Sequence, residues 1–329
     1  MTPSRPRPSA TVVVLTHASA RTLPACLAAL LPQVAEVGAR LLVVDNESPD
    51  DTVAVARGLG VEPVRAGANL GFARGCNLAA EQADGDALVL VNPDAVLDPG
   101  CLVALLRAMR TDRGAGPIGG RAHLRDGSYD PRCVLGRPSL HGALGFATGA
   151  STLLPRRRLT APEDGPRWLP ADGSVLDVPA VSGAVMAVPT GLWRALGGFD
   201  ERYFLYGEDV DLSLRARALG WQPVVATSAG YTHAGGASSA SSRARDLWLH
   251  RGKAELYHRH LAPRSARWAV RGLQMGARLR SLAAELPVER ASAPGRRWAA
   301  VYADRALWRG GYGEPAGDPT AKRAREVAR

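Results

Sequence analysis

The sequence lacks the usual features of a secreted or membrane-spanning protein. Its four cysteines lie far apart without a Cys-x-x-Cys pair, which argues against a zinc ribbon and a secreted disulfide scaffold. No window approaches the roughly 20 apolar residues that a spanning helix requires. The apolar run after the Pro-rich start is too short for a signal peptide. We therefore expect a cytoplasmic protein with a flexible tail at residues 1–9, whose membrane contact, if any, is peripheral.

Two common phosphate-binding loops are also missing. No Gly-x-Gly-x-x-Gly follows the first predicted strand, and no Gly-x-x-x-x-Gly-Lys-[Ser/Thr] occurs in the chain. A dinucleotide site or P-loop would therefore lack its phosphate cradle. No zinc-finger spacing or aromatic RNA-binding motif occurs, so nucleic acid is not expected as a partner. Any bound phosphate needs another counter-charge.

The basic charge of the chain is concentrated at its C-terminal end. From Arg243 onward there are 19 Lys or Arg against 8 Asp or Glu, a net charge of +11, which leaves −1 for residues 1–242 of a chain that totals +10. Basic amphipathic helices are predicted around Leu247–His260, Trp268–Leu286 and Trp298–Trp308. Two interpretations remain open: an anionic membrane surface as partner, or ordinary solvated helix faces packed on the main domain.

The first hundred residues alternate between strand and helix patterns. The strands are apolar without polar alternation, which indicates a mostly parallel sheet covered on both faces by helices. In such sheets ligands collect beyond the carboxyl ends of the strands. The predicted strands are Ala10–Leu15, Arg40–Val44, Val61–Val64 and Ala87–Val91, and the predicted helices are Arg21–Leu31, Asp50–Leu59 and Arg74–Ala83.

Polar residues follow three of these strands directly. Thr16 comes after the first strand, Asp45 and Asn46 after the second, and Asn92 and Asp94 after the fourth. Asp45 can accept hydrogen bonds from a nucleoside, or it can simply start the next turn. Asp94 is suited to hold Mg²⁺ or Mn²⁺, although an Asn-Pro-Asp turn is common by itself. These residues are expected to converge on one edge of the sheet.

An acidic block precedes the last predicted helix of this domain. Within Gly197–Trp221, five carboxylates occupy twelve positions, at Asp200, Glu201, Glu208, Asp209 and Asp211. They cannot all be buried as anions, so we expect them to face water, a metal or a substrate hydroxyl. A helix is predicted from Glu208 onward. The alternative is an acidic first turn that only complements the helix dipole.

Five ordered blocks of sequence resemble the family 2 inverting glycosyltransferases, most closely the bacterial rhamnosyltransferases. The resemblance covers roughly residues 10–240. The blocks are VVDNESPDDT at 43–52, NLGFARGCN at 69–77, LVNPDA at 90–95, SGAVMAV at 182–188, and GGFDERYFLYGEDVDLSLRARALGW at 197–221.

The resemblance implies a GT-A fold, an α/β domain that binds a nucleotide-sugar. This domain would span residues 10–240, with its nucleotide-binding half at 10–115 and its acceptor and catalytic half at 116–240. Residues 241–329 would form a basic helical extension. The region Gly120–Val178, rich in Pro, Gly and Arg without clear periodicity, is expected to form surface loops on the acceptor side.

The resemblance also implies roles for single residues. Asp209 would be the catalytic base, with Glu208 beside it, while Asp94 and His233 would bind Mg²⁺ or Mn²⁺. Asn92 replaces the first acid of the metal motif, so the metal would depend chiefly on Asp94. His233 could instead be a core histidine. The residues expected at the nucleoside and diphosphate are Thr16, Asp45, Asn46, Asn69, Gly71, Arg74, Asn77 and Asn92.

The expected reaction is a single displacement with inversion at the anomeric carbon. The implied donor is dTDP-L-rhamnose, with galactofuranose, glucose and N-acetylglucosamine donors as alternatives. The implied acceptor is a glycan or a lipid-linked sugar of the cell envelope. A glycoside hydrolase also uses two carboxylates, and a non-catalytic sugar-nucleotide-binding protein would bind without turnover. Both stay open as alternatives from other classes.

Overall fold

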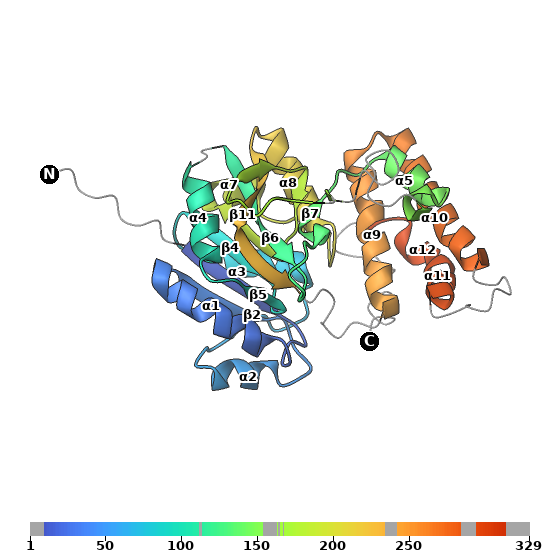
Figure 1. Ribbon diagram of the computed structural model, residues 1–329. Coiled ribbons are helices and arrows are strands. Elements are labelled where there is room, and N and C mark those ends of the chain that lie inside the picture. The colour runs from blue at the N-terminus through green and yellow to red at the C-terminus, as the bar shows by residue number, and fades with distance from the viewer. Residues whose placement is uncertain are drawn as a thin grey trace. The chain divides into compact units, whose positions relative to one another are not determined.

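The computed structural model describes residues 10–111, 114–153, 163, 165–166, 168–233, 242–283 and 294–313. The tail expected at residues 1–9 lies outside the described residues. The chain divides into two compact units (Figure 1). Unit 1 comprises Met1–Leu135, Pro166–Asp200 and Asp209–Ser239, and unit 2 comprises Gly136–Gly165, Glu201–Glu208 and Ala240–Arg329.

Unit 1 is built on a nine-stranded sheet in the order β3-β2-β1-β4-β10-β6-β11-β5, with β8 paired to β11. A two-stranded sheet pairs β7 (Val134–Leu135) with β9 (Ala180–Val181). The strands of the large sheet are β1 (Ala10–Thr16), β2 (Arg40–Asp45), β3 (Val64–Arg65), β4 (Ala87–Val91), β5 (Ala95–Leu97), β6 (Ala115–His123), β8 (Val175–Asp177), β10 (Val185–Pro189) and β11 (Gln222–His233).

The predicted mostly parallel sheet is confirmed. The strands β3, β2, β1 and β4 are joined by parallel pairings, and β6 pairs with β11 in parallel, whereas β10, β5 and β8 run against their neighbours. Every residue of β1 and β4 is buried, as expected of apolar strands with helices on both sides.

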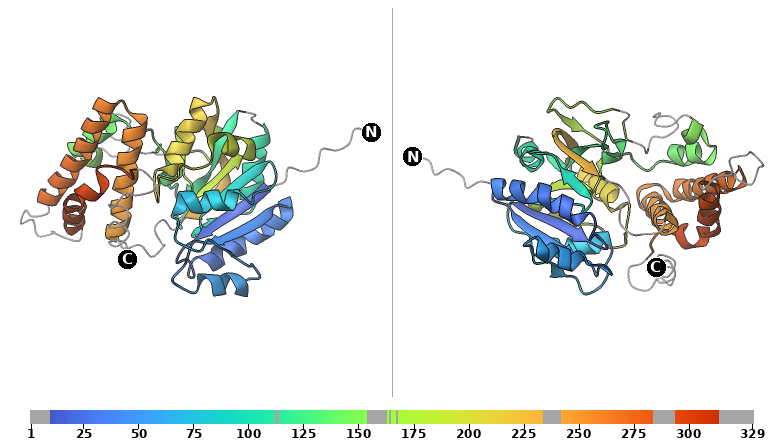
Figure 2. Two further views of the ribbon diagram at one scale, coloured as in Figure 1. Left: turned by 180° about the vertical axis from the view of Figure 1, so that it is seen from behind. Right: turned by 60° about the horizontal axis from the view of Figure 1, so that its bottom comes forward.

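Helices cover both faces of this sheet. The helix α1 (Leu23–Val37) packs against α4 (Cys101–Thr111) on the face of the sheet that is toward the viewer in Figure 1. The helix α3 (Phe72–Ala80) packs on β1 and is visible in the left view of Figure 2, which shows the molecule from behind. The others in unit 1 are α2 (Thr52–Gly58), α7 (Thr190–Leu196) and α8, which covers Glu208–Ala218 and starts with the last residue of unit 2.

Two predicted elements differ from those observed. The strand expected at Val61–Val64 is reduced to β3, because Pro63 has no N–H for the ladder and the Val61 N–H donates to Ala56 at the end of α2. The helix expected from Arg74 starts two residues earlier, after Gly71. This glycine has a φ of +80°, in the left-handed region that glycine tolerates best.

The region expected as acceptor-side loops contains regular elements. Strand β6 extends to His123, a 3₁₀ helix covers Pro131–Cys133, and helices α5 (Leu140–Ala147) and α6 (Ala150–Leu153) follow. The periodicity of α5 was hidden because small residues form its buried side: Gly142, Ala143, Gly145 and Ala147. Residues 154–162 of this region lie outside the described part of the chain.

Unit 2 contains α5, α6 and the predicted C-terminal helices, which are confirmed. They are α9 (Ser242–His260), α10 (Pro263–Ala283), α11 (Pro294–Ala303) and α12 (Arg305–Trp308). The helix α10 packs against α5, α9 and α11. A Cβ built on Gly272 of α10 would lie 2.9 Å from the backbone oxygen of Ala143 in α5, so these two helices approach at backbone distance. No described helix has both the length and the apolar character for crossing a membrane.

The segment 201–208 joins unit 2 although it lies within the domain expected at residues 10–240. The Tyr312 hydroxyl donates to the Leu205 carbonyl oxygen, and the Leu205 N–H lies 3.2 Å from the same hydroxyl. The buried Arg251 guanidinium donates to the carbonyl oxygens of Gly311 at 2.8 Å and Tyr312 at 3.2 Å. Residues near the end of the chain therefore hold the segment that leads into α8.

Candidate functional site

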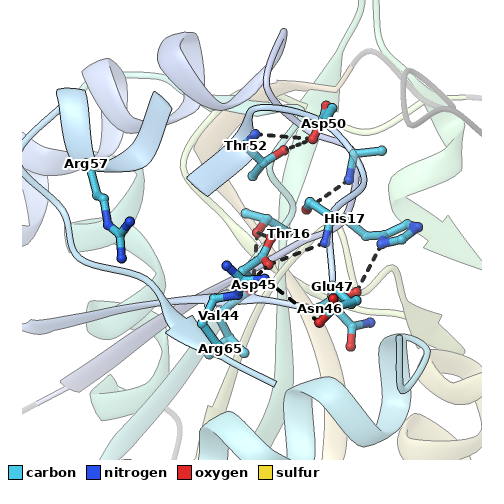
Figure 3. A network of polar contacts seen from close by, with 12 residues as sticks. Thr16, His17, Val44, Asp45, Asn46, Glu47, Asp50, Thr52, Arg57 and Arg65 are labelled. Atoms are coloured by element: carbon cyan, nitrogen blue, oxygen red, sulfur yellow. Dashed lines mark hydrogen bonds and ion pairs between the residues drawn. The ribbon is translucent and has the colours of Figure 1, made fainter. Parts of the chain in front are cut away.

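The tips of β1 and β2 meet at one edge of the sheet in unit 1. The parallel register pairs Thr16 with Asp45, and the Thr16 hydroxyl lies 3.5 Å from the Asp45 carboxylate. Asp45 is fully buried; it accepts the Ser48 N–H at 3.3 Å and pairs with Arg65 at 3.2 Å (Figure 3). Asp45 thus starts the following turn, and a nucleoside would have to share its carboxylate with Arg65.

Arg65 is a candidate that the sequence analysis missed. It is the last residue of β3, one position beyond the strand expected there, and its side chain is 51% exposed above the buried Asp45. Because Arg65 directly follows the predicted strand Val61–Val64, the rule that strand ends carry ligand contacts applies to it as well. An exposed guanidinium at this edge can donate to a nucleotide oxygen.

Asn46 ties this tip to the loop before α3. Its side-chain amide donates to Asn69 Oδ1 at 3.2 Å and to the Gly71 carbonyl oxygen at 3.1 Å, and its Oδ1 accepts the Leu70 N–H at 2.9 Å. The His17 ring lies 3.0 Å from the Asn46 carbonyl oxygen and 3.2 Å from the Asn69 amide nitrogen. The loop expected at the nucleoside therefore does lie beside the β1 and β2 tips.

Asp94 and His233 come together from segments 139 positions apart in sequence. His233 ends β11 and pairs with Ala95 of β5, which places its Nε2 atom 3.0 Å from Asp94 Oδ1 and 3.5 Å from the Asn92 amide nitrogen. Two ligands about 2.1 Å from one ion and at right angles lie about 3 Å apart. The pair therefore fits a shared Mg²⁺ or Mn²⁺ ion.

Asp94 and His233 would fill only part of such a coordination sphere. No cluster of three or more His, Cys, Asp or Glu side chains suited to a metal occurs among the residues that the structure describes. A carboxylate and an imidazole leave positions for the diphosphate oxygens of a nucleotide or for water. This donor set suits an ion that arrives with a nucleotide better than a permanently bound one.

Arg132 lies near this pair and was also missed. It forms an ion pair with Asp130 at 2.6 Å, within the 3₁₀ helix that Asp130 caps. The hydrogen bond to Asp130 and, as a smaller contribution, the charge of Asp94 raise the pKa of Arg132. The guanidinium, 55% exposed, is thus within electrostatic reach of the candidate metal ligands. Because this stretch was expected to be a surface loop, no pattern singled it out.

Two adjacent residues connect Asp209, the expected base, to the turn Asn92–Asp94, which we call the metal turn. Between β9 and β10, the Gly183 N–H donates to Asp209 Oδ2 at 3.0 Å, and the carbonyl oxygen of the next residue, Ala184, accepts the Asn92 N–H at 2.8 Å. A Cβ built on Gly183 would lie 3.5 Å from the Phe72 ring and 3.6 Å from Asp209 Cβ. Asp209, the α3 loop and the metal turn therefore border one site in unit 1.

The environment of Asp209 suits a proton acceptor. Burial raises the pKa of its carboxyl, and the N–H groups of Gly183 and Val210 oppose this effect only in part. A carboxylate that loses hydration becomes a stronger base. Its oxygens are held at fixed positions by the two backbone donors, so the lone pairs that remain have a defined direction.

The other carboxylates of the acidic block have separate positions. Asp211 is fully buried and pairs with Arg215 at 2.6 Å, while Arg215 also donates to the carbonyl oxygens of Leu196 and Gly198 at 2.9 Å. Asp211 is thus a buried anion with a cationic partner, which indicates a structural role for this member of the acidic block. Glu208 is buried as well, and Glu201 is exposed.

Asn77 has a structural role because its side chain binds the backbone of Phe199. Its amide donates to the Phe199 carbonyl oxygen at 2.9 Å and its Oδ1 accepts the Phe199 N–H at 2.9 Å.

We predict that Asn77→Ala lowers the free energy of unfolding by about 1–3 kcal/mol, because two backbone groups lose their partner, and leaves the KM for the donor unchanged. Urea titration and donor kinetics check this. A large rise in KM at unchanged stability would show that Asn77 contacts the nucleotide instead.

Arg74, in contrast, is exposed in the first turn of α3, directly after the Asn69–Gly71 loop. The N-terminus of a helix favours anions, and a guanidinium there adds a full positive charge. Its position allows it to approach a diphosphate.

Comparison with known proteins identifies the family of this chain. Residues 11–137 match the family model described as Glycosyl transferase family 2. The N-acetylglucosaminyl-diphospho-decaprenol L-rhamnosyltransferase of Mycobacterium tuberculosis is 32% identical over 288 residues, covering 79% of this chain and 89% of that protein. The O-antigen biosynthesis protein RfbC of Myxococcus xanthus is 31% identical over 180 residues, covering 53% of this chain and 13% of that protein.

Solved structures share the fold. A mannosyltransferase of Pyrobaculum calidifontis, solved with GDP-Man and Mn²⁺, gives a TM-score of 0.51 at 17% identity and covers 98% of this chain and 85% of that one. Glucosyl-3-phosphoglycerate synthase of Mycobacterium tuberculosis, solved with Mn²⁺, UDP and phosphoglyceric acid, gives 0.52 at 16% identity and covers 78% and 80%. These are GT-A structures, and the expected fold class is thus confirmed. With a relative 32% identical over most of its length, the chain belongs to glycosyl transferase family 2 and is a glycosyltransferase.

Proposed function

We propose that this glycosyltransferase moves L-rhamnose from dTDP-L-rhamnose to a hydroxyl of a polyprenyl-diphosphate-linked sugar. The support is the relative from Mycobacterium tuberculosis, whose name specifies L-rhamnosyl transfer to N-acetylglucosaminyl-diphospho-decaprenol. The match covers 89% of that protein and 79% of this chain. Donors carrying galactofuranose, glucose or N-acetylglucosamine are the alternatives.

The observation that carries the mechanism is the Gly183–Ala184 connection. It holds the Asp209 carboxylate and the Asn92–Asp94 turn through neighbouring peptide groups. Asp209 takes the proton of the acceptor hydroxyl as that oxygen attacks the anomeric carbon from the face opposite the leaving diphosphate. The configuration inverts in one displacement, and Glu208, at the start of the same helix, acts as a neighbour of the base.

Asp94 and His233 are the residues that would hold Mg²⁺ or Mn²⁺. An ion bound there would supply Lewis-acid stabilisation for the negative charge that develops on the leaving diphosphate. Arg74 and Arg132 add positive charge on the protein side, and the amide of Asn92 lies beside the metal pair. Thr16, Asp45, Asn46, Asn69 and Gly71 form the nucleoside edge, with Arg65 added to the set that the sequence predicted.

A lipid-linked acceptor lies in a membrane, so we also propose that the protein works at the cytoplasmic face of the plasma membrane through its basic C-terminal helices. The net charge of +11 from Arg243 onward supports this location.

Ligand-dependent stability and acceptor-dependent turnover test the proposal. With Mn²⁺ present and donor at 100 times its Kd, dTDP-L-rhamnose should stabilise the fold by about 2.7 kcal/mol, measured as a rise in Tm, and UDP-glucose and UDP-N-acetylglucosamine should stabilise it less. dTDP should be released only when a polyprenyl-diphosphate-linked sugar is added. Release without acceptor would favour hydrolysis, and a larger shift with another nucleotide-sugar would overturn the rhamnose assignment.

A further inference from the structure

One side of α10 is exposed and combines two kinds of side chain. We define the α10 face as Arg264, Arg267, Trp268, Arg271, Met275 and Leu279, which are all exposed, and each of them has another member three or four positions away. Trp268, Met275 and Leu279 are 58%, 54% and 47% exposed. These values are high for large apolar side chains, and the helical spacing puts them in one row with the arginines.

The opposite side of α10 is fully used in packing. Gly272 and Gly276 approach α5 closely, and Ala269, Leu273 and Ala277 are buried. The helix therefore already buries one side against the rest of unit 2. The apolar residues on its exposed side are additional to those that this packing needs. The α10 face lies on the other side of the same helix, and its three large apolar side chains are each about half exposed.

The charge of the helix has a single sign. From Pro263 to Ala283 the sequence contains five arginines and no Asp or Glu. Arg264, Arg267, Trp268 and Arg271 line a hollow in the surface. The Arg271 guanidinium lies 5.0 Å from the centre of the Trp268 ring. Within the described residues, none of these three arginines pairs with a carboxylate, so their charge is available to an outside anion.

We propose that the α10 face docks on an anionic phospholipid surface, with the arginines at the phosphates and Trp268, Met275 and Leu279 in the boundary between headgroups and acyl chains. A tryptophan beside arginines is suited to that boundary, because its apolar ring can contact acyl chains while its N–H contacts water or headgroups. A nucleic acid would match the charge but leave Met275 and Leu279 exposed. The proposal rests on the proposed membrane location and narrows it to one helix face of unit 2.

Vesicle sedimentation of the full chain tests it. Wild-type protein should sediment with vesicles of phosphatidylglycerol and phosphatidylcholine at equal amounts, and not with phosphatidylcholine alone. The triple variant Arg264→Gln, Arg267→Gln, Arg271→Gln should partition roughly 100-fold less, because each of the three basic side chains near such a surface contributes about fivefold. The pair Trp268→Ser, Leu279→Ser should lose the part of the binding that survives high salt, since apolar insertion is not screened.

A matched control removes the same charge elsewhere. Arg21→Gln, Arg110→Gln and Arg194→Gln change three exposed arginines of unit 1 and should leave partitioning unchanged. Glutamine keeps the helix propensity of arginine, and far-UV circular dichroism verifies folding. If wild-type protein binds no vesicle, the membrane location itself is wrong. If it binds and the α10 triple variant binds equally well, or if that variant alone changes the oligomeric state, this face is not the docking surface.

Discussion

Asp209→Asn is expected to lower kcat by about 10³-fold while the affinity for the donor is retained. A positioned general base contributes about 10²- to 10⁴-fold, and Asp209 accepts the N–H of Gly183, whose neighbour Ala184 accepts the Asn92 N–H. An asparagine of the same shape cannot accept the acceptor proton. Single-turnover kinetics with saturating donor, and donor binding by calorimetry, separate the two quantities.

The pH profile of kcat/KM gives a second measurement of the same prediction. Because burial raises the pKa of Asp209, the reactive carboxylate is present above this raised value and is lost as the pH falls through it. The acid limb should therefore lie at a higher pH than the usual value of about 3.9 for Asp. In the Asp209→Asn variant, residual activity should lose this limb.

Glu201→Gln is the control for the base. Glu201 lies in the same acidic block and is exposed, so neutralising it should leave kcat unchanged. Near-normal turnover by Asp209→Asn would sink the assignment of the base and favour a binding protein or a different carboxylate. Loss of activity in both variants would indicate that the acidic block acts through its total charge.

Asp94→Asn is expected to lower kcat at least 100-fold and to shift the Mn²⁺ concentration needed for activity upward. The reason is that charge stabilisation at a leaving group is worth about 10²- to 10³-fold per interaction, and Asp94 is the anionic member of the pair with His233. Activity titrated with Mn²⁺ and Mg²⁺ measures both effects. His233→Ala should act in the same direction, since the ion would keep only one protein ligand.

The sheet offers a matched control for the metal pair. Asp98 and His123 form a second Asp–His contact, at 2.7 Å, on the neighbouring part of the fold. Asp98→Asn should leave the metal titration unchanged, because within the described part of the chain no hydrogen bond or ion pair joins the side chains of this pair to Asn92, Gly183 or Asp209. The reverse result, with Asp98→Asn sensitive to metal and Asp94→Asn normal, would move the metal site to the second pair.

The strand tips were the most predictable part of the site. Uninterrupted apolar runs place Thr16, Asp45 and Asp94 at the carboxyl ends of buried parallel strands, and local sequence is sufficient for that. Arg65 directly follows the predicted strand Val61–Val64, but only its tertiary contact with the buried Asp45 distinguishes it from other exposed arginines. Arg132 was missed because its significance depends on the distance to Asp94, which the sequence separation conceals.

The sequence by itself determined the parallel α/β sheet, the polar tips, the helix that carries Asp209 and the basic C-terminal helices, since each depends on short-range pattern and composition. Only the tertiary structure decided which of these groups meet. In the folded protein Asp211 is buried against Arg215 and His233 lies beside Asp94. Gly183 and Ala184 connect Asp209 to the turn Asn92–Asp94. Such contacts join segments far apart in the chain, and their energies depend on a packed, water-poor environment that forms only when the whole sheet has folded.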